Sequence, residues 1–118
     1  MTTRKKPLTP AMMQILVAVG TDEKHGYGIM RELEGLFTAP PMGPGTLYRS
    51  IKQLLEGGLL EERERPDEED PRRRYYRVTE AGAAAAAAEA AHLEALVGRA
   101  RETGLLRPHP AAPSPGTT

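Results

Sequence analysis

Four arginines and two tyrosines stand within six residues, 72–77, of a 118-residue chain that carries no net charge. Guanidinium groups bind phosphate and carboxylate oxygens through charge-assisted hydrogen bonds, and tyrosine hydroxyls can contact the same oxygens. An acidic run, Asp67-Glu68-Glu69-Asp70, comes just before this cluster. The residue types therefore indicate local anion binding, with an acidic segment close by.

No comparable set of residues indicates catalysis or metal binding. The chain has no cysteine, which excludes disulfides, zinc–thiolate sites and thiol catalysis. His25, His92 and His109 share no metal-ligand spacing. There is also no nucleophile–base pair, no pair of carboxylates in an apolar setting and no phosphate-loop motif. We therefore expect neither an enzyme nor a protein that holds a metal or another cofactor.

The composition fits one small domain with a thin core. Tryptophan is absent and phenylalanine occurs once, so the core must use Leu, Ile, Val, Met and Tyr. Dimerisation is a common way to enlarge such a core. No apolar run is long enough for a signal peptide or a membrane span, so we expect a cytoplasmic protein without a membrane partner. The excess of arginine over lysine, with many alanines, glycines and prolines, is typical of a GC-rich bacterial genome.

Positive and negative charges nearly balance in both parts of the chain. Residues 1–78 hold 13 basic and 12 acidic side chains, and residues 79–118 hold 3 and 4. Neither part is basic as a whole. A surface for nucleic acid must therefore be a local patch.

Three helices with apolar faces are predicted before the arginine cluster. The first begins with Thr9 as N-cap and Pro10 at the first helical position, and Gly20 ends it. The second covers "HGYGIMRELEGLF", and the third, "TLYRSIKQLLEGG", is closed by its two final glycines. Apolar residues recur at helical spacing in all three. They are Met12, Ile15, Leu16 and Val19, then Ile29, Met30, Leu33, Leu36 and Phe37, then Leu47, Ile51, Leu54 and Leu55.

A hairpin and a last helix complete the predicted fold. "LLEERER" and "RRRYYRV" are strand candidates, and "PDEEDP" between them fits a long hairpin tip. Thr79 caps the last helix, whose alanine run favours helix formation. The Pro-rich end of the chain is expected to be disordered. This order predicts a mainly α fold with a two-stranded β-hairpin, a winged helix-turn-helix, followed by a C-terminal dimerisation helix.

In four blocks, from Leu8 to Gly82, the sequence resembles the PadR-type transcriptional regulators. The blocks are "LTPAMMQILVAV", "HGYGIMREL", "GPGTLYRSIKQLLEGGLL" and "RRRYYRVTEAG". The resemblance implies a cytoplasmic homodimer that binds double-stranded operator DNA, usually as a repressor. The third helix would enter the major groove, and the wing would lie along the backbone or in the minor groove. Several members release DNA when a small aromatic or lipophilic compound binds, so a small-molecule effector is a candidate partner.

This reading divides the chain into four parts. They are a flexible basic arm at 1–7, a DNA-binding domain at 8–79, a dimerisation helix at 80–106 and a disordered tail at 107–118. The last helix resembles that of members with a single short dimerisation helix. Its apolar stripe is the expected dimer interface, and the first three of its residues, with Met12, are the candidate lining of an effector site. The stripe consists of Leu93, Leu96, Val97 and Ala100.

The third helix offers the residues for reading bases. Thr46, Arg49, Ser50 and Gln53 are expected on its outward polar face. A bidentate contact from Arg49 or Gln53 to a base edge gives roughly 1–3 kcal/mol of discrimination. Lys52 lies at the edge of this face, where it would neutralise a phosphate. The alternative is that these residues form the polar face of any surface helix.

Two features at the start of this helix extend the expected contact with DNA. Tyr48 lies at the boundary of the inward face, so we expect its ring to be packed and its hydroxyl to point outward. In PadR-type proteins the tyrosine of this "LY" pair is a signature position, and its hydroxyl can reach the DNA backbone. The preceding Gly-Pro-Gly, residues 43–45, lets the helix N-terminus approach a phosphate closely.

Strand alternation divides the arginine cluster between two faces of the wing. Since Val78 must face the core, Tyr76 does too, and Tyr75 should be the more exposed ring. Arg74 is on the core side but near the tip of the wing, where its head can reach solvent or DNA. The predicted DNA contacts of the wing are Arg63, Arg65, Arg72, Arg73, Arg74 and Tyr75.

Two alternatives stay open for the wing. Its arginines can instead pair with the acidic residues 67–70 and with Glu61, Glu62 and Glu64. Such exposed pairs contribute only ~0–1 kcal/mol, but they compete with DNA for the same arginines. The acidic tip either projects past the duplex or weakens non-specific binding. The other functional class is a winged-helix module whose wing meets an acidic protein partner.

Overall fold

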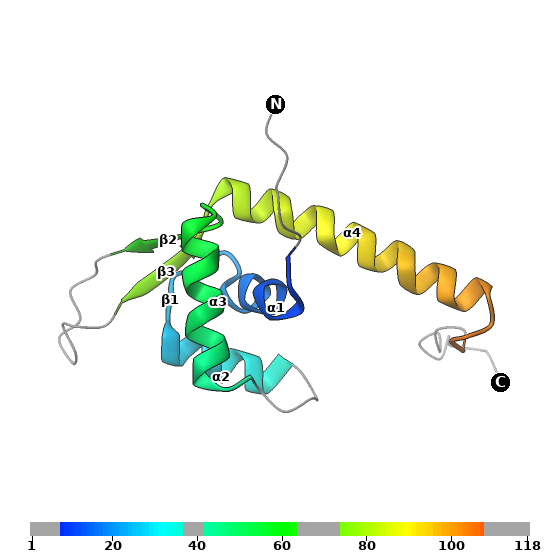
Figure 1. Cartoon of the computed structure of the whole chain (residues 1–118), viewed down its shortest axis with the longest axis horizontal. Coiled ribbons are helices and arrows are strands. Elements are labelled where there is room, and N and C mark those ends of the chain that lie inside the picture. Colours follow the sequence, from blue (N-terminus) through cyan, green and yellow to red (C-terminus); the bar gives the residue numbers. More distant parts are fainter. Residues whose placement is uncertain (1–7, 37–41, 64–73, 108–118) are drawn as a thin grey trace, which may run out of the picture. The chain divides into compact units, whose positions relative to one another are not determined.

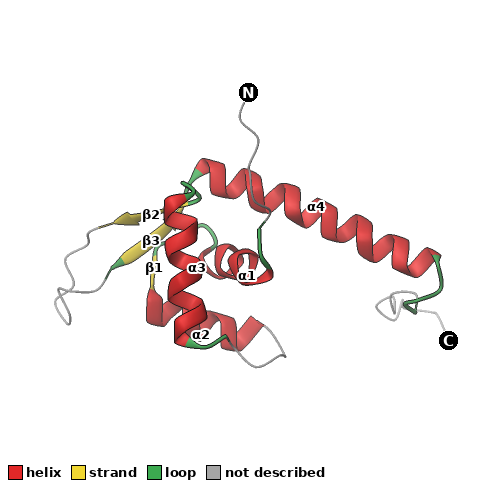
Figure 2. Ribbon diagram, viewed as in Figure 1, coloured by secondary structure: helices red, strands yellow, loops and turns green. Residues whose placement is uncertain are grey.

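The computed structural model of the chain describes residues 8–36, 42–63 and 74–107. The elements follow the order predicted for a winged helix, with one short strand added (Figure 1). Helices make up most of the described residues (Figure 2), which confirms the mainly α fold class. The elements are α1 (Pro10–Val19), β1 (Lys24–His25), α2 (Gly26–Leu36), α3 (Pro44–Glu56), β2 (Leu60–Arg63), β3 (Tyr75–Val78) and α4 (Glu80–Glu102).

The predicted ends of α1 are confirmed, whereas α3 begins two residues before the predicted Thr46. The Thr9 hydroxyl accepts the Met12 N–H at 3.1 Å, and Pro10 is the first residue of α1. The helix ends before Gly20, whose φ of 63° is a conformation that glycine adopts at little cost. α3 starts at Pro44 and ends at the predicted glycine pair.

The sheet has three antiparallel strands, one more than predicted, in the order β1-β3-β2. β2 pairs with β3 so that Leu60 lies opposite Val78 and Arg63 opposite Tyr75. On the other side of β3, His25 lies opposite Tyr75. β1 is two residues long, so it shows no alternation that a sequence could reveal.

The core lies between α1, α2, α3 and one face of the sheet. The predicted apolar faces of the helices are buried in it, at Ile15, Ile29 and Leu33 among others. Leu60 and Tyr76 supply the contribution of the sheet, with 2% and 7% of their surfaces exposed. The side chain of Leu36 and all of Phe37 lie outside the described residues.

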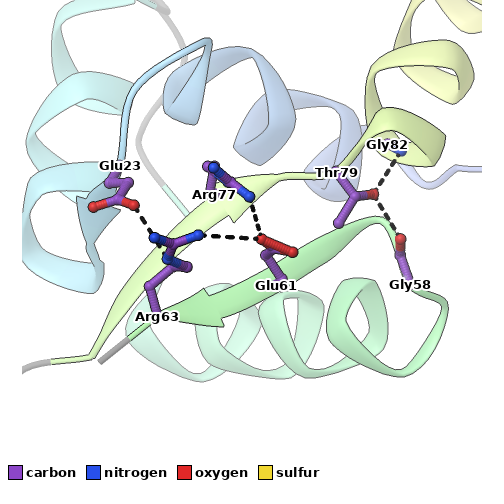
Figure 3. Close-up of polar contacts among 7 residues, drawn as sticks. All are labelled: Glu23, Gly58, Glu61, Arg63, Arg77, Thr79 and Gly82. Carbon is purple, nitrogen blue, oxygen red and sulfur yellow. Dashed lines mark hydrogen bonds and ion pairs between the residues drawn. The ribbon is translucent and has the colours of Figure 1, made fainter. Parts of the chain in front are cut away.

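Thr79, which follows β3, forms hydrogen bonds to the turn after α3 and to the first turn of α4 (Figure 3). Its hydroxyl donates to the Gly58 carbonyl at 2.7 Å and accepts the Gly82 N–H at 3.0 Å, which caps α4 as predicted. A Cβ at Gly82 would overlap the carbonyl oxygen of Leu59. The first turn of α4 is therefore fixed against the turn that follows α3, and only glycine leaves room for this approach.

α4 runs through two compact units, which divide between Ala87 and Ala88. In the first unit, Ala85 and Ala86 pack against the core. In the second, Leu96 is 57% exposed. The helix stops before Gly104, whose φ is 85°. Among the residues that the structure describes, no helix is both long and apolar enough to cross a membrane.

Candidate nucleic-acid interface

α3 presents a polar face that its buried residues hold in place. Leu47, Ile51 and Leu54 are at most 2% exposed and fix the rotation of the helix about its axis. The opposite side is exposed over the first three turns. The exposed residues there are Thr46, Tyr48, Arg49, Lys52 and Gln53. Four of them are the polar residues predicted for this face, and they can donate hydrogen bonds to bases or phosphates.

Ser50 is the exception, and its predicted place on the outward face is wrong. Its exposed fraction is 5%, which puts it inside the protein. It follows Leu47 by three residues and precedes Leu54 by four, so it lies on their side of the helix. Polarity alone led to the wrong face, whereas helical spacing indicates the right one.

Tyr48 lies across the start of α2. A Cβ on Gly26 would be 2.5 Å from the Tyr48 hydroxyl oxygen and 3.0 Å from two of its ring atoms. The ring is therefore packed, as predicted, and the side chain is half exposed. The hydroxyl oxygen lies beside Gly26, and its contact with DNA stays a prediction. α3 and the N-terminus of α2 thus form one surface, and a glycine makes that contact close.

Next to Gly26 is an aromatic group that the sequence analysis did not single out. The His25 ring accepts the Gly28 N–H through Nδ1 at 3.0 Å, stacks on Tyr27 at 6.3 Å and meets Tyr75 edge-on at 5.4 Å. Tyr27 is 58% exposed, and the Arg31 guanidinium lies 5.8 Å from its ring centre. The Tyr27 hydroxyl accepts a hydrogen bond from Arg31 and so raises the Arg31 pKa. The i, i+4 spacing of Tyr27 and Arg31 is the signal that could have found this pair.

On the core-facing side of the wing, Arg74 forms an ion pair with Glu62. The Arg74 Nη1 and the Glu62 Oε2 are 2.7 Å apart, and Glu62 lies opposite Tyr76 in the register. The pKa of Tyr76 is raised, mainly by burial and then by the negative charge of Glu62 and by Tyr48, while Arg74 opposes this. Arg74, Glu62 and Tyr76 therefore lie together on the core-facing side of the wing.

The other face of the wing carries a chain of alternating charges (Figure 3). Arg63 lies between two carboxylates, 3.4 Å from Glu23 and 3.8 Å from Glu61. Glu61 also pairs with Arg77 at 2.5 Å. The sequence did not indicate Glu23 or Arg77 as parts of this network. The pairing of wing arginines with Glu61 and Glu62, which is part of one of the two alternatives, is thus observed.

The structure brings only some of the predicted wing residues close to α3. Arg74 lies on the side that faces the core, whereas Arg63 and Tyr75 lie on the other side, as the alternation predicts. Arg65, Arg72 and Arg73 lie outside the described residues, as do the acidic tip and the N-terminal arm. Of the two wing tyrosines, Tyr75 is the more exposed, which confirms that prediction.

The predicted dimer stripe is largely exposed. Leu93, Leu96 and Val97 are 41%, 57% and 37% exposed, and Ala100 is half buried. In the described part of the chain, no group of three or more histidine, aspartate or glutamate side chains is placed to hold a metal ion.

Comparison with known proteins gives a family and a fold. Residues 15–88 match the transcriptional regulator PadR-like family. Smu.1704 from Streptococcus mutans has a similar structure, with 21% identity, a TM-score of 0.65, and coverage of 86% of this chain and 92% of that one. No curated protein matches the sequence.

Two further solved structures are longer than this chain. ZitR of Lactococcus lactis, a zinc-responsive MarR family member, has 22% identity and a TM-score of 0.61, with 86% of this chain and 64% of that one covered. AdcR of Streptococcus pyogenes, an adhesin competence repressor, has 17% identity and a TM-score of 0.58, with 84% and 67% covered. At these identities the likeness concerns the fold.

Proposed function

The chain belongs to the PadR-like family of transcriptional regulators, and we propose that it is a homodimeric repressor that binds operator DNA. In this proposal α3 enters the major groove and the wing lies along the DNA backbone. The exposed polar face of α3 carries the proposal. Three buried leucine and isoleucine side chains fix the rotation of the helix, so the face that carries Arg49 and Gln53 is turned outward.

The start of α3 is open enough for DNA to come close. Gly43 offers no side chain to cap the helix, and a Cβ at Gly43 or Gly45 would meet nothing within 4 Å among the described residues. Packing within the protein therefore does not require glycine at either position. A phosphate at this helix N-terminus gives a reason for both, because the backbone can approach it without a side chain in between.

Tyr48, Lys52 and Arg74 are the proposed contacts to phosphates. Their side chains are exposed, and Arg74 lies on the core-facing side of the wing. Contacts of this kind fix the position of the protein on the duplex and weaken as the salt concentration rises. The other wing contacts, at Arg63, Arg65, Arg72, Arg73 and Tyr75, stay predictions.

The exposed stripe on α4 supports a second copy as the dimer partner. Its residues recur at i, i+3, i+4 and i+7, the spacing of one helix face. A two-fold dimer would place two half-sites about 34–36 Å apart on one side of the DNA. Sedimentation equilibrium tests this point: Leu96→Glu should give a monomer where the unaltered chain gives a dimer. A dimer that survives this change would contradict the assignment.

Repression in the cytoplasm and release by a small molecule complete the proposal. The resemblance to the family supports both, and a thermal-shift panel of aromatic and lipophilic compounds tests the effector. Stabilisation by one of them, followed by loss of DNA binding in its presence, is the expected result. A panel without any stabilising compound would leave regulation by such a ligand unsupported.

A footprint on the DNA upstream of its own gene tests the reading of bases by α3. The unaltered chain should protect a site there and bind an unrelated duplex more weakly. Changing Arg49 and Gln53 to alanine together should remove the footprint, whereas Arg99→Ala on α4 removes a positive charge and should leave it. An intact footprint in the double variant would rule out direct readout by these residues. Equal, weak binding of the unaltered chain to both duplexes would favour a protein-interaction module.

A further inference from the structure

β2 carries two adjacent glutamates whose ion pairs lie on opposite faces of the wing. Glu61 binds Arg77 and Arg63 on the face turned away from the core. Glu62 binds Arg74 on the other face, opposite Tyr76 in the register. The two residues have the same charge and the same strand. They differ in which arginines they contact and in whether those arginines lie on the side of α3.

We propose that Glu62 limits the affinity of the protein for DNA by occupying the place on Arg74 that a phosphate takes in the complex. DNA binding then requires that a phosphate displaces the Glu62 carboxylate. This inference rests on the proposed function, because it concerns the same interface. The basic residues of this interface support DNA binding. The inference adds one acidic residue, Glu62, that opposes it.

Among the wing arginines that the structure describes, Arg74 is the one best placed for this exchange. Its side chain is 60% exposed although it is bound to Glu62, so a phosphate can reach the guanidinium from solvent. It also lies on the face of the wing that carries Tyr76, and Tyr76 packs in the same core cluster as the buried residues of α3. A duplex docked on α3 would therefore bring its backbone toward Arg74. Arg77 lies on the opposite face, which is turned away from the core.

Carboxylate and phosphate compete for a guanidinium in the same way. Both accept charge-assisted hydrogen bonds from its planar N–H groups, and arginine binds either one in a bidentate arrangement. The pair is exposed on both sides, at 60% for Arg74 and 37% for Glu62, so it is weak enough to open. Since phosphates carry no sequence information, the effect of Glu62 should be the same on every duplex.

The test compares Glu62→Gln with Glu61→Gln by fluorescence anisotropy. Each variant loses one negative charge from β2, so any effect of the general electric field on DNA is similar in both. Glu62→Gln should tighten binding about two- to fivefold, as expected for release of an exposed ion pair. The gain should appear on the fragment upstream of the gene and on a mixed-sequence duplex alike. Glu61→Gln should increase the affinity for DNA by a clearly smaller factor.

Arg74 supplies the second control. In an Arg74→Gln background, Glu62→Gln should no longer tighten binding, because the group that it releases is absent. Equal gains from the two glutamate variants, or a gain that persists without Arg74, would show a field effect only and overturn the proposal. Weaker binding by Glu62→Gln would overturn it as well, because Glu62 would then be positioning Arg74 for DNA. Thermal unfolding of each variant checks that the fold is kept.

A heparin column separates failure of this inference from failure of the proposed function. If the unaltered chain binds neither duplex, the proposed function fails and displacement by DNA fails with it. Later elution of Glu62→Gln than of Glu61→Gln from heparin would then show that Glu62 does mask Arg74 from a polyanion. If the unaltered chain binds DNA while the two glutamate variants bind alike, only the role of Glu62 is overturned.

Discussion

The two faces of the wing have similar charges and different surroundings. The face toward the core holds Leu60, Tyr76 and the pair of Arg74 with Glu62. The other face holds the network of Glu23, Arg63, Glu61 and Arg77 in Figure 3. Both faces neutralise their arginines with glutamates. The number of arginines in a strand therefore says little about DNA binding, and their position relative to α3 says more.

The largest expected difference between the faces concerns stability. Leu60 is 2% exposed and contributes to the core, so Leu60→Ala should cost roughly 2–5 kcal/mol of unfolding free energy. Glu61→Ala, one residue along the same strand, should cost at most about 1 kcal/mol, because its ion pairs are exposed. Urea unfolding followed by circular dichroism measures both. Similar losses at the two positions would contradict the division of β2 into a buried and an exposed face.

A smaller effect is expected at the contact between α2 and α3. Gly26→Ala would push the Tyr48 hydroxyl aside and should weaken DNA binding by about 1 kcal/mol, roughly fivefold. Folding should suffer little, because Tyr48 is half exposed and can rotate away. Anisotropy with the upstream fragment measures the affinity.

Gly28→Ala is the matched control for this contact. A Cβ there would lie 3.5 Å from the His25 ring, an ordinary contact, and alanine favours the helix. This variant should keep its affinity and unfold at the same or a higher temperature. Equal affinities of the two variants would show that the position of Tyr48 does not matter for binding.

The smallest effect is a loss of stability at alkaline pH. Burial raises the pKa of Tyr76 above its ordinary value, so the folded protein keeps that proton longer than the unfolded chain does. The resulting contribution to the free energy of unfolding is fully present below the ordinary tyrosine pKa, about 10. It is lost as the pH rises through the higher pKa that Tyr76 has in the folded protein. Thermal unfolding between about pH 8 and 11 should therefore show a smaller decline for Tyr76→Phe than for the unaltered chain. The same decline in both would contradict burial of the hydroxyl on the core-facing side.

Local signals in the sequence were enough for the helices. Capping by Thr9 and Thr79 and the stop at Gly20 depend on residues next to one another in the chain, and the apolar period of α3 needs only one turn of context. β1 could not be predicted, because two residues form a strand only through pairing with β3, some 50 residues away. The alternation of inward and outward residues predicted for the wing strand is confirmed, with Tyr76 buried and Tyr75 more exposed.

The interface was less predictable, because it depends on contacts between distant segments. The register of β2 and β3 decides that Glu62 meets Arg74 and Glu61 meets Arg77, and no local pattern fixes that register. The approach of Gly26 to Tyr48 likewise joins two helices. Ser50 differs, since its spacing from the buried leucines of α3 already predicts that it is buried.

The salt dependence of DNA binding by two arginine variants tests the central claim most directly. Anisotropy with the upstream fragment, over a series of salt concentrations, compares the unaltered chain with Arg74→Ala and Arg77→Ala. We predict that Arg74→Ala weakens binding and lowers the slope of log affinity against log salt by about 1, since one phosphate contact is lost. Arg77→Ala should leave the slope unchanged. Equal slopes for Arg74→Ala and the unaltered chain, or a reduced slope for Arg77→Ala alone, would contradict the account.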